Sequence, residues 1–251
     1  MQAILNALEA QHAELAALLE PLDDAGWERP TRCEGWNVSD VVLHLAQTDV
    51  LALASAEGRF AEGLNVLAGG TQPQGNVDDG AAAMVASERG VSNGELLNRW
   101  RTGAMALRAA LAAGDPHRRV DWVAGQLSIQ TLVTTRLAEC WIHTGDVAEA
   151  LDVTQEPTDR LQYIARLAWR TLPYAFARNG RQLSGPVAFD LRAPSGERWQ
   201  FVPDTEPATV IEGPGAELCL VAARRVAPDA TSLRGTGPDV RAVLDLVRTY
   251  A

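Results

Sequence analysis

Three side chains in this sequence have the types and the spacing to hold one metal ion: His44, Glu139 and His143. Glu139 and His143 are four residues apart, so on a helix both side chains project from the same face, one turn apart. His44 lies among apolar residues, which direct its predicted helix toward a core. Two histidines and one glutamate with a fourth position open form a known type of catalytic zinc site. The sequence therefore offers a metal centre shared by two helices.

Spacing alone leaves a plainer interpretation open. A Glu/His pair at this spacing is common by chance, and a single histidine on a helix is more often a core or surface residue than a ligand. The pattern is also not HExxH, so nothing in it favours a metalloprotease.

Other polar residues have simple structural explanations. Asp40 stands at the third position of a predicted helix, where it favours a helix cap. His12 and His117 have no partner in the sequence and are expected at the surface. Cys33 and Cys140 lie beside the candidate site in the sequence, but Cys140 lies about 100° around its predicted helix from Glu139. We therefore expect no cysteine on the metal-binding face.

The elements that must position the candidate ligands are four segments with apolar residues at helical spacing, namely 2–20, 37–60, 93–113 and 128–151. Helices of this kind combine most simply in a bundle. An antiparallel four-helix bundle is therefore predicted for residues 1–155. The glycine-rich stretch 61–80 is predicted as a long loop, and its role as a lid, a binding loop or a disordered connector is open.

The pattern changes after Pro157. A helix over 158–178 precedes three segments with strand character, at 186–192, 198–202 and 209–212. Turn residues between the first two predict a hairpin. Two further helices are predicted at 216–225 and 238–250. Residues 156–251 are therefore predicted to form a small α+β domain with a short antiparallel sheet.

Composition narrows the class of protein. The chain has 251 residues, of which 47% are hydrophobic and 22% charged, with a net charge of −10. This profile is typical of a soluble globular protein, and the absence of a basic stripe argues against nucleic acid or an anionic membrane as a partner. No apolar run is long enough to span a bilayer and no signal peptide is evident, so a cytoplasmic location is expected. The three cysteines are widely separated, which argues against a disulfide framework.

Two motifs carry a family resemblance. The segment from Thr31 to Leu45, TRCEGWNVSDVVLHL, resembles the signature T-x-C-x-G-W-x-V-x-D-L-x-x-H-L of the mycothiol-dependent maleylpyruvate isomerase family. The segment from Arg136 to Asp146, RLAECWIHTGD, resembles the second signature of that family, R-x-x-E-x-x-x-H-x-x-D. Members belong to the DinB-like superfamily of metal-binding four-helix bundles, which fits residues 1–152.

The resemblance implies roles for particular residues. His44, Glu139 and His143 would hold a divalent metal, zinc in the first place, with nickel or iron as alternatives. Asp146 would orient a ligand imidazole, or it simply faces solvent. In the family an arginine on a late helix of the C-terminal domain contributes to the active site. Arg224 is the nearest match, with Arg225 as the alternative, although exposed arginines at a helix end are also common.

The resemblance also implies a chemistry. Mycothiol, the low-molecular-weight thiol of actinobacteria, would bind the metal, and the resulting thiolate would add to a small electrophilic substrate, making the protein an isomerase or a thiol S-transferase. Two alternatives stay open. One is a thiol-independent metalloenzyme, such as a hydrolase, lyase or cyclase, and the other is a non-catalytic module that binds a small ligand. The sequence does not distinguish a monomer from a homodimer, and it does not identify the substrate.

Overall fold

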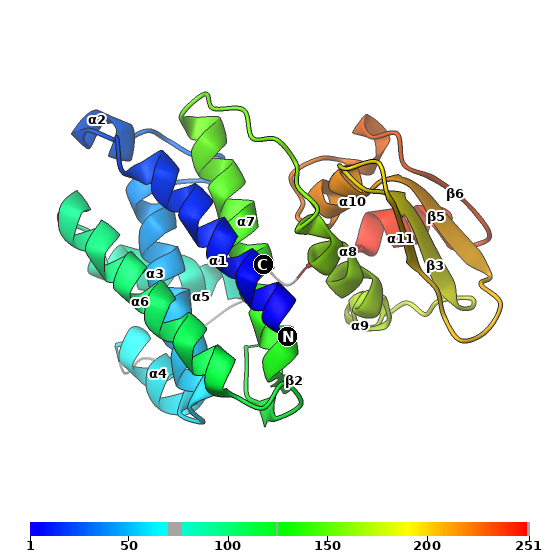
Figure 1. The fold of residues 1–251 in the computed structure, drawn as a ribbon, viewed down its shortest axis with the longest axis horizontal. Helices are drawn as coiled ribbons and strands as arrows, with labels where there is room; N and C mark the ends of the chain where they lie inside the picture. The colour runs from blue at the N-terminus through cyan, green and yellow to red at the C-terminus, as the bar shows by residue number, and fades with distance from the viewer. Residues whose placement is uncertain (70–76, 124, 250–251) are drawn as a thin grey trace. The chain divides into compact units, whose positions relative to one another are not determined.

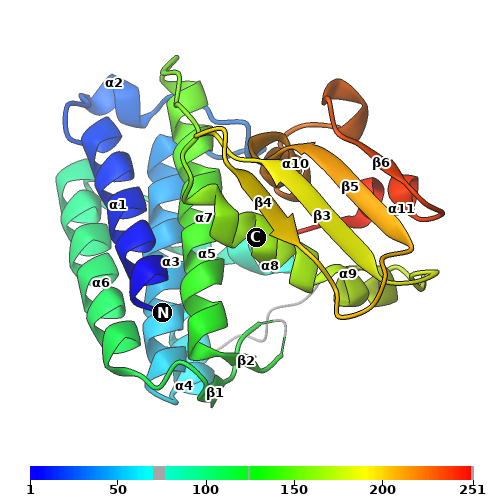
Figure 2. The same ribbon diagram turned by 45° about the vertical axis from the view of Figure 1, so that its right-hand side comes forward.

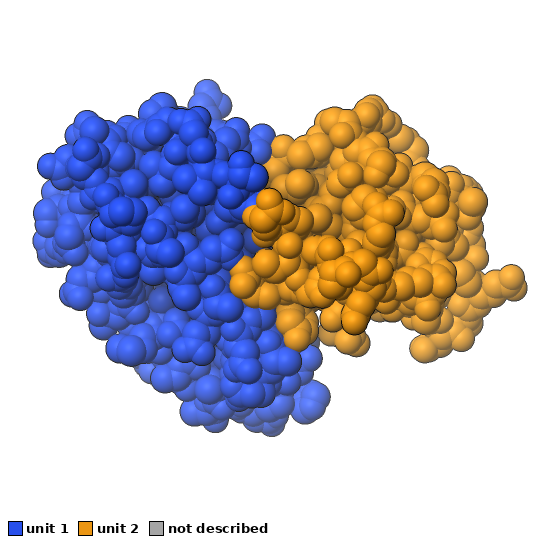
Figure 3. Space-filling model, turned by 45° about the horizontal axis from the view of Figure 1, so that its top comes forward, with its two compact units in different colours: residues 1–155 blue, residues 156–251 orange. Residues whose placement is uncertain are grey.

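The computed structural model describes residues 1–69, 77–123 and 125–249. The chain forms two compact units, Met1–Gln155 and Glu156–Ala251, which Figure 3 shows in different colours. Most of the regular structure is helical, and the second unit also holds a four-stranded sheet. The prediction of a mostly helical protein with a small sheet is therefore confirmed. Among the described residues, no helix combines the length and the apolar character needed to cross a bilayer.

The first unit is built around four long helices (Figure 1). They are α1 (Gln2–Leu19), α3 (Val38–Ala56), α6 (Asn93–Ala113) and α7 (Ile129–Ala150). Both α1 and α3 pack against α6 and α7, and Figure 2 shows the four helices side by side. In this view α3 runs antiparallel to α7, whereas α1 runs in the same direction as α7. The long connections between successive helices allow such parallel neighbours.

The described part of the segment predicted as a loop over 61–80 is largely helical, which corrects that prediction there. Helix α4 (Phe60–Leu67) and helix α5 (Val77–Glu88) contain most of its described residues, and the stretch 70–76 lies outside them. Gly63 sits where α4 crosses α3, and an added Cβ there would lie 2.7 Å from the Cβ of Ala54. At least one glycine of this stretch thus permits close helix packing, although the glycine-rich sequence of the stretch is typical of a loop.

Shorter elements complete the first unit. Helix α2 (Asp24–Trp27) lies in the stretch predicted as a polar turn, and its start is capped by the side chain of Asp23. Strands β1 (Arg119–Val120) and β2 (Leu127–Ser128) form a two-residue antiparallel ladder before α7. This small ladder leaves the helical character of the unit unchanged.

The second unit begins with two helices where one was predicted. Helix α8 (Leu161–Arg170) and helix α9 (Leu172–Arg178) are separated at Thr171. Pro173 stands in the first turn of α9. Because proline has no N–H and its ring clashes with the preceding turn, it cannot lie inside one continuous helix. The prediction of a single helix over 158–178 is therefore wrong.

The sheet of the second unit has the order β4-β3-β5-β6. Its strands are β3 (Val187–Arg192), β4 (Arg198–Phe201), β5 (Thr209–Pro214) and β6 (Arg234–Thr236). The second unit also contains α10 (Gly215–Ala222), the 3-10 helix η1 (Pro228–Ala230) and α11 (Val240–Leu246). The predicted hairpin is present, because β3 pairs antiparallel with β4. The pairing of β3 with β5 is parallel, so the sheet is mixed and the antiparallel prediction is wrong. Four of the six residues of β3 are buried, as expected for a central strand with a partner on each edge.

The buried position of His12 contradicts its expected place at the surface. Its side chain is only 5% exposed. Arg108 of α6 donates a 2.7 Å hydrogen bond to Nδ1 of His12, and the imidazole meets the ring of Trp100 edge to face. Burial, together with the charge of Arg108, lowers the pKa of His12 to about 3. Sequence patterns could not reveal this partner, because it lies 96 residues away.

We expect the protein to lose stability as the pH falls from about 6.5 toward 3. Below pH 6.5 the unfolded chain protonates His12, whereas the folded protein does so only near pH 3, so the unfolded state binds more protons. The contribution of neutral His12 to the free energy of unfolding is complete above pH 6.5. Its loss reaches about 5 kcal/mol at most near pH 3. Urea unfolding at a series of pH values measures it.

The control for this measurement is a second histidine. His12→Gln cannot titrate and should flatten the slope of stability against pH over this interval. His117→Gln, which replaces an exposed histidine, should leave the slope unchanged. The same slope in the wild type and in His12→Gln would show that burial of His12 is not its source.

Candidate metal centre

His44 projects from α3, whose first turn is fixed by side chains. The carboxamide of Asn37 accepts a hydrogen bond from the backbone N–H of Asp40 at 2.9 Å, and the carboxylate of Asp40 accepts one from the N–H of Asn37 at 3.2 Å. This reciprocal pair is a capping box. Arg89 donates two further 2.9 Å hydrogen bonds to Asp40. Asp40 is thus a helix cap, as predicted, and it anchors the helix that carries His44.

Glu139 and His143 project from α7 toward His44. Oε1 of Glu139 lies 2.8 Å from Nε2 of His44 and 3.6 Å from Nε2 of His143. One ligand atom from each of the three residues lies within 4.8 Å of the other two. All three side chains are buried, each residue being 7% exposed. The fold therefore brings the three sequence-predicted ligands together.

The donor set fits a divalent ion such as zinc. Ligand atoms about 2.1 Å from a tetrahedral zinc ion lie about 3.4 Å from one another. The His143–Glu139 separation is close to this value, and the His44–Glu139 contact needs to open by about half an ångström. Nδ1 of His44 has no hydrogen-bond partner among the described residues, so no second bond holds this ring against that adjustment.

Burial and hydrogen bonds act in opposite directions on these groups. Burial opposes the charge of Glu139, but hydrogen bonds from His143 and His44 outweigh it and hold the pKa of Glu139 well below its usual value. Burial likewise opposes the charge of His143, but hydrogen bonds with Asp146, Cys33 and Glu139 raise its pKa well above the usual range. Burial lowers the pKa of His44. The centre thus places a carboxylate that favours its charged form between one imidazole whose pKa is raised and one whose pKa is lowered.

The opposite edge of the His143 ring is held by Asp146. Oδ2 of Asp146 lies 3.0 Å from Nδ1 of His143, and Asp146 is only 1% exposed. A carboxylate at the second nitrogen is the usual partner of a metal-ligating histidine, because it fixes the tautomer and the direction of the ring. Of the two roles considered for Asp146, the geometry excludes a side chain that simply faces solvent.

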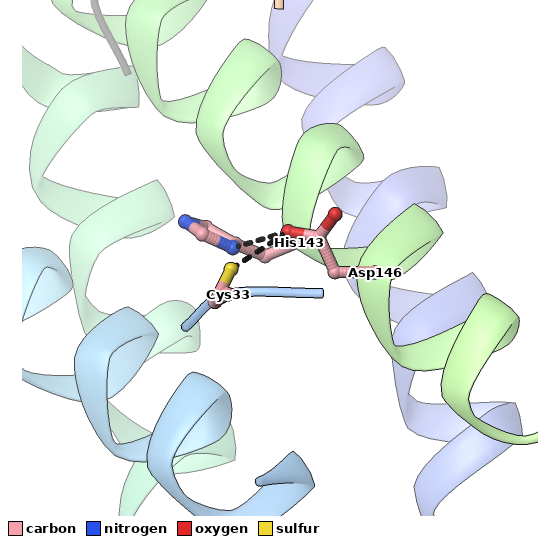
Figure 4. Close-up of side chains that lie close together, drawn as sticks. All are labelled: Cys33, His143 and Asp146. Carbon is pink, nitrogen blue, oxygen red and sulfur yellow. Dashed lines mark hydrogen bonds and ion pairs between the residues drawn. The ribbon is translucent and has the colours of Figure 1, made fainter. Parts of the chain in front are cut away.

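Cys33 also lies beside this pair, on the Nδ1 edge of His143 and not on the edge that faces Glu139. The thiol of Cys33 donates to the same oxygen of Asp146 at 3.3 Å, and Figure 4 shows the three side chains converging. Cys33 is half-buried, whereas Cys140 and Cys219 are buried. The sequence could not reveal this contact, because Cys33 precedes Asp146 by 113 residues. Its presence inside the first family motif was the available signal.

Comparison with known proteins places the first unit in a family. Residues 8–148 match the model of the mycothiol maleylpyruvate isomerase N-terminal domain. The chain belongs to this family.

Similar proteins extend over nearly the whole chain. Two uncharacterized proteins of Mycobacterium tuberculosis, from strains CDC 1551 / Oshkosh and ATCC 25618 / H37Rv, are each 34% identical over 247 residues, which is 97% of this chain and 93% of theirs. Crystal structures of a mycothiol-dependent maleylpyruvate isomerase and of its histidine-to-alanine mutant are similar in fold, with TM-scores of 0.60 and 0.61. They are 19% identical to this chain, and each comparison covers 95% of both chains.

In this member of the maleylpyruvate isomerase family, an ion pair behind the centre was missed by sequence reasoning. Nε of Arg136 donates to Oδ1 of Asp49 at 3.1 Å, and another guanidinium nitrogen donates to the hydroxyl of Thr48 at 2.9 Å. Arg136 and Asp49 are each 2% exposed. The hydroxyl of Thr48 in turn donates to the backbone carbonyl of His44. Charged residues within two otherwise buried helices were the signal that could have revealed the pair.

A cleft of about 560 Å³ opens near the start of α3. Trp36 lines it, and the ring of Trp36 also lies 5.1 Å from the ring of His44. The rest of the cleft's lining is mixed, with charged residues such as Asp40 and Arg89 beside apolar residues such as Leu43. A single indole ring thus contacts both the wall of a solvent-accessible cleft and a candidate ligand.

Arg224 belongs to the second unit and follows the end of α10. Its backbone has φ = 60°, in the left-handed region that glycine usually occupies after a helix. The predicted helix over 216–225 therefore ends earlier, at Ala222. The residue is exposed, and its role at the active site stays a prediction.

We expect the purified protein to hold close to one equivalent of a divalent metal. His44→Ala and His143→Ala should each lower that content severely, because each removes one of three protein ligands and leaves the charge of Glu139 less compensated. Elemental analysis after dialysis measures the content. His117→Ala, an exposed histidine, is the matched control and should keep full occupancy. Full occupancy in His44→Ala or His143→Ala would remove that residue from the centre.

Proposed function

We propose that this protein is a metal-dependent enzyme of the mycothiol maleylpyruvate isomerase family that uses mycothiol as a co-substrate. The thiol would add to an activated double bond or another electrophilic carbon of a small substrate. In an isomerase, addition creates a single bond that can rotate, and elimination then returns the thiol. In an S-transferase the adduct is released. The buried set of His44, Glu139 and His143 is the observation that carries this proposal.

Each residue of this set has a distinct task in the proposal. His44 and His143 would offer Nε2 to the ion, and Glu139 would offer a carboxylate oxygen, which leaves a tetrahedral ion one open position. A divalent ion held there supplies Lewis acidity, which lowers the pKa of a thiol and favours its thiolate at neutral pH. Asp146 would keep the ring of His143 turned so that Nε2 faces Glu139.

The placement of the protein's own thiols supports an external nucleophile. Cys140 and Cys219 are buried, and burial raises the pKa of Cys140 to about 12, so this thiol stays protonated. Cys33 is nearer, but it contacts Asp146 on the Nδ1 edge of His143, whereas Nε2 lies toward Glu139. No cysteine of this chain is therefore directed at the open position.

Arg224 is proposed to bind an anionic group of the substrate, such as a carboxylate or a developing enolate. Its left-handed backbone supports this assignment over Arg225. An arginine in this conformation costs about 1–2 kcal/mol relative to an unstrained one. A residue kept in a strained position is more simply explained by function than by stability.

Activity should require mycothiol and should survive loss of every cysteine. The test is a variant with Cys33→Ser, Cys140→Ala and Cys219→Ala, assayed on maleylpyruvate and on other electrophilic acids with and without the thiol. Thiol-dependent turnover supports the proposal. Turnover without any thiol would favour a hydrolase, lyase or cyclase, and loss of activity in a folded variant would place the nucleophile on the protein. Metal-independent binding without turnover would indicate a small-ligand module.

Arg224→Gly should make the fold more stable and the enzyme less active. Glycine relieves the left-handed strain, which is expected to raise the free energy of unfolding by about 1 kcal/mol. Loss of the guanidinium should lower kcat/KM by about a hundredfold. Arg225→Ala is the matched control and should change neither value greatly. Denaturant unfolding and steady-state kinetics measure the two effects, and unchanged kinetics in Arg224→Gly would remove this residue from the site.

A further inference from the structure

The loop that carries Cys33 is held by a set of short-range hydrogen bonds. The N–H of Thr31 donates to the carbonyl of Trp36 and the N–H of Trp36 donates to the carbonyl of Cys33, each at 2.9 Å. The hydroxyl of Thr31 also accepts from the N–H of Cys33 at 3.2 Å. Gly35 completes the turn with φ = 74°, a conformation that other residues rarely adopt. The loop therefore presents the thiol at one defined place.

At that place three ligand atoms of different kinds converge. The sulfur of Cys33, a ring nitrogen of His143 and a carboxylate oxygen of Asp146 all lie within 4.8 Å of one another. Sγ and Nδ1 are 3.3 Å and 3.0 Å from the same oxygen of Asp146 (Figure 4). Around a tetrahedral ion with a sulfur ligand at about 2.3 Å and nitrogen and oxygen ligands at about 2.1 Å, such atoms would lie about 3.4–3.6 Å apart. The two distances to Asp146 would need to lengthen by only a few tenths of an ångström.

We propose that Cys33, His143 and Asp146 form a second metal position, selective for thiophilic divalent ions such as Cd²⁺ or excess Zn²⁺. Asp146 and His143 are buried, whereas Cys33 is half-buried and is the most exposed of the three. A thiolate, an imidazole and a carboxylate together make a softer donor set than His44, Glu139 and His143, which contains no sulfur. The softer ion is therefore directed to the position that contains Cys33.

The two positions compete for one imidazole. A neutral imidazole has a single lone pair, on Nε2 or on Nδ1 but not on both. When an ion binds Nδ1, the lone pair is on that nitrogen, so Nε2 carries the proton and cannot bind a second ion on the Glu139 side. The hydrogen bond between His143 and Asp146 is also broken. Binding releases the proton of the Cys33 thiol and any proton on Nδ1 to solvent, and no electron transfer is involved. A thiophilic ion should thus act as an inhibitor of the proposed enzyme, and only this consequence rests on the proposed function.

The test is a titration of the full-length protein, prepared free of metal, with Cd²⁺. Binding by a thiolate creates a sulfur-to-cadmium charge-transfer absorption in the ultraviolet. We expect the wild type to develop this absorption to a plateau of close to one thiolate per chain. Cys33→Ser and Cys33→Ala should lose at least nine-tenths of it, although both retain the buried Cys140 and Cys219. No absorption in the wild type, or the same absorption in both variants, would overturn the proposal.

A second variant separates this proposal from the first metal centre. His44→Ala removes a ligand of that centre but none of this one, so the charge-transfer absorption should persist and should appear at a lower Cd²⁺ concentration. Loss of the absorption in a folded His44→Ala variant would contradict the proposed ligand set. If the proposed function is correct, Cd²⁺ should also inhibit the Zn²⁺-loaded wild type at least tenfold more strongly than the Zn²⁺-loaded Cys33→Ser variant. If the proposed function fails, the absorption is still expected.

Discussion

The first unit is organised around a carboxylate buried between two imidazoles. Moving a carboxylate from water into a protein interior costs several kcal/mol unless hydrogen bonds and opposite charge compensate it. Glu139 is 7% exposed and obtains this compensation from His44 and His143. The two partners come from different helices, so the charge is tolerated only when α3 and α7 are correctly placed. A divalent ion could supply the same compensation. One arrangement of side chains therefore suits the protein both with and without a bound ion.

The placement of α3 against α7 is fixed by a second buried charge pair. Asp49 lies five residues beyond His44, and its partner Arg136 lies three residues before Glu139, as expected for antiparallel helices. Rotating either helix by one residue would turn its side chains by about 100° and separate both pairs at once. Apolar contacts tolerate such slips better than buried polar pairs, which must keep their partners. We infer that the ion pair contributes to register more than to net stability.

Much of the fold and the three candidate metal ligands could be predicted from the sequence because the signals were local. Helical spacing located four long helices, and spacing of four residues placed Glu139 and His143 on one face. What the sequence could not reveal depends on contacts between distant segments. The burial of His12 depends on Arg108, and the position of Cys33 depends on a loop that only the fold brings to Asp146. The parallel pairing of β3 with β5 is also non-local, since nothing in a strand states the direction of its neighbour.

Under the proposed function, the position of Cys33 explains how the enzyme could use an external thiol. A thiol on the protein with access to the open metal position would act at an effective concentration far above that of a dissolved co-substrate. An enzyme that depends on a dissolved thiol must therefore keep its own thiols from that position. Here the loop before α3 holds Cys33 on the Nδ1 edge of His143, where Asp146 accepts its S–H hydrogen bond. In this proposal the carboxylate of Asp146, which orients the candidate ligand His143, also separates the protein's own sulfur from the position that the co-substrate would occupy.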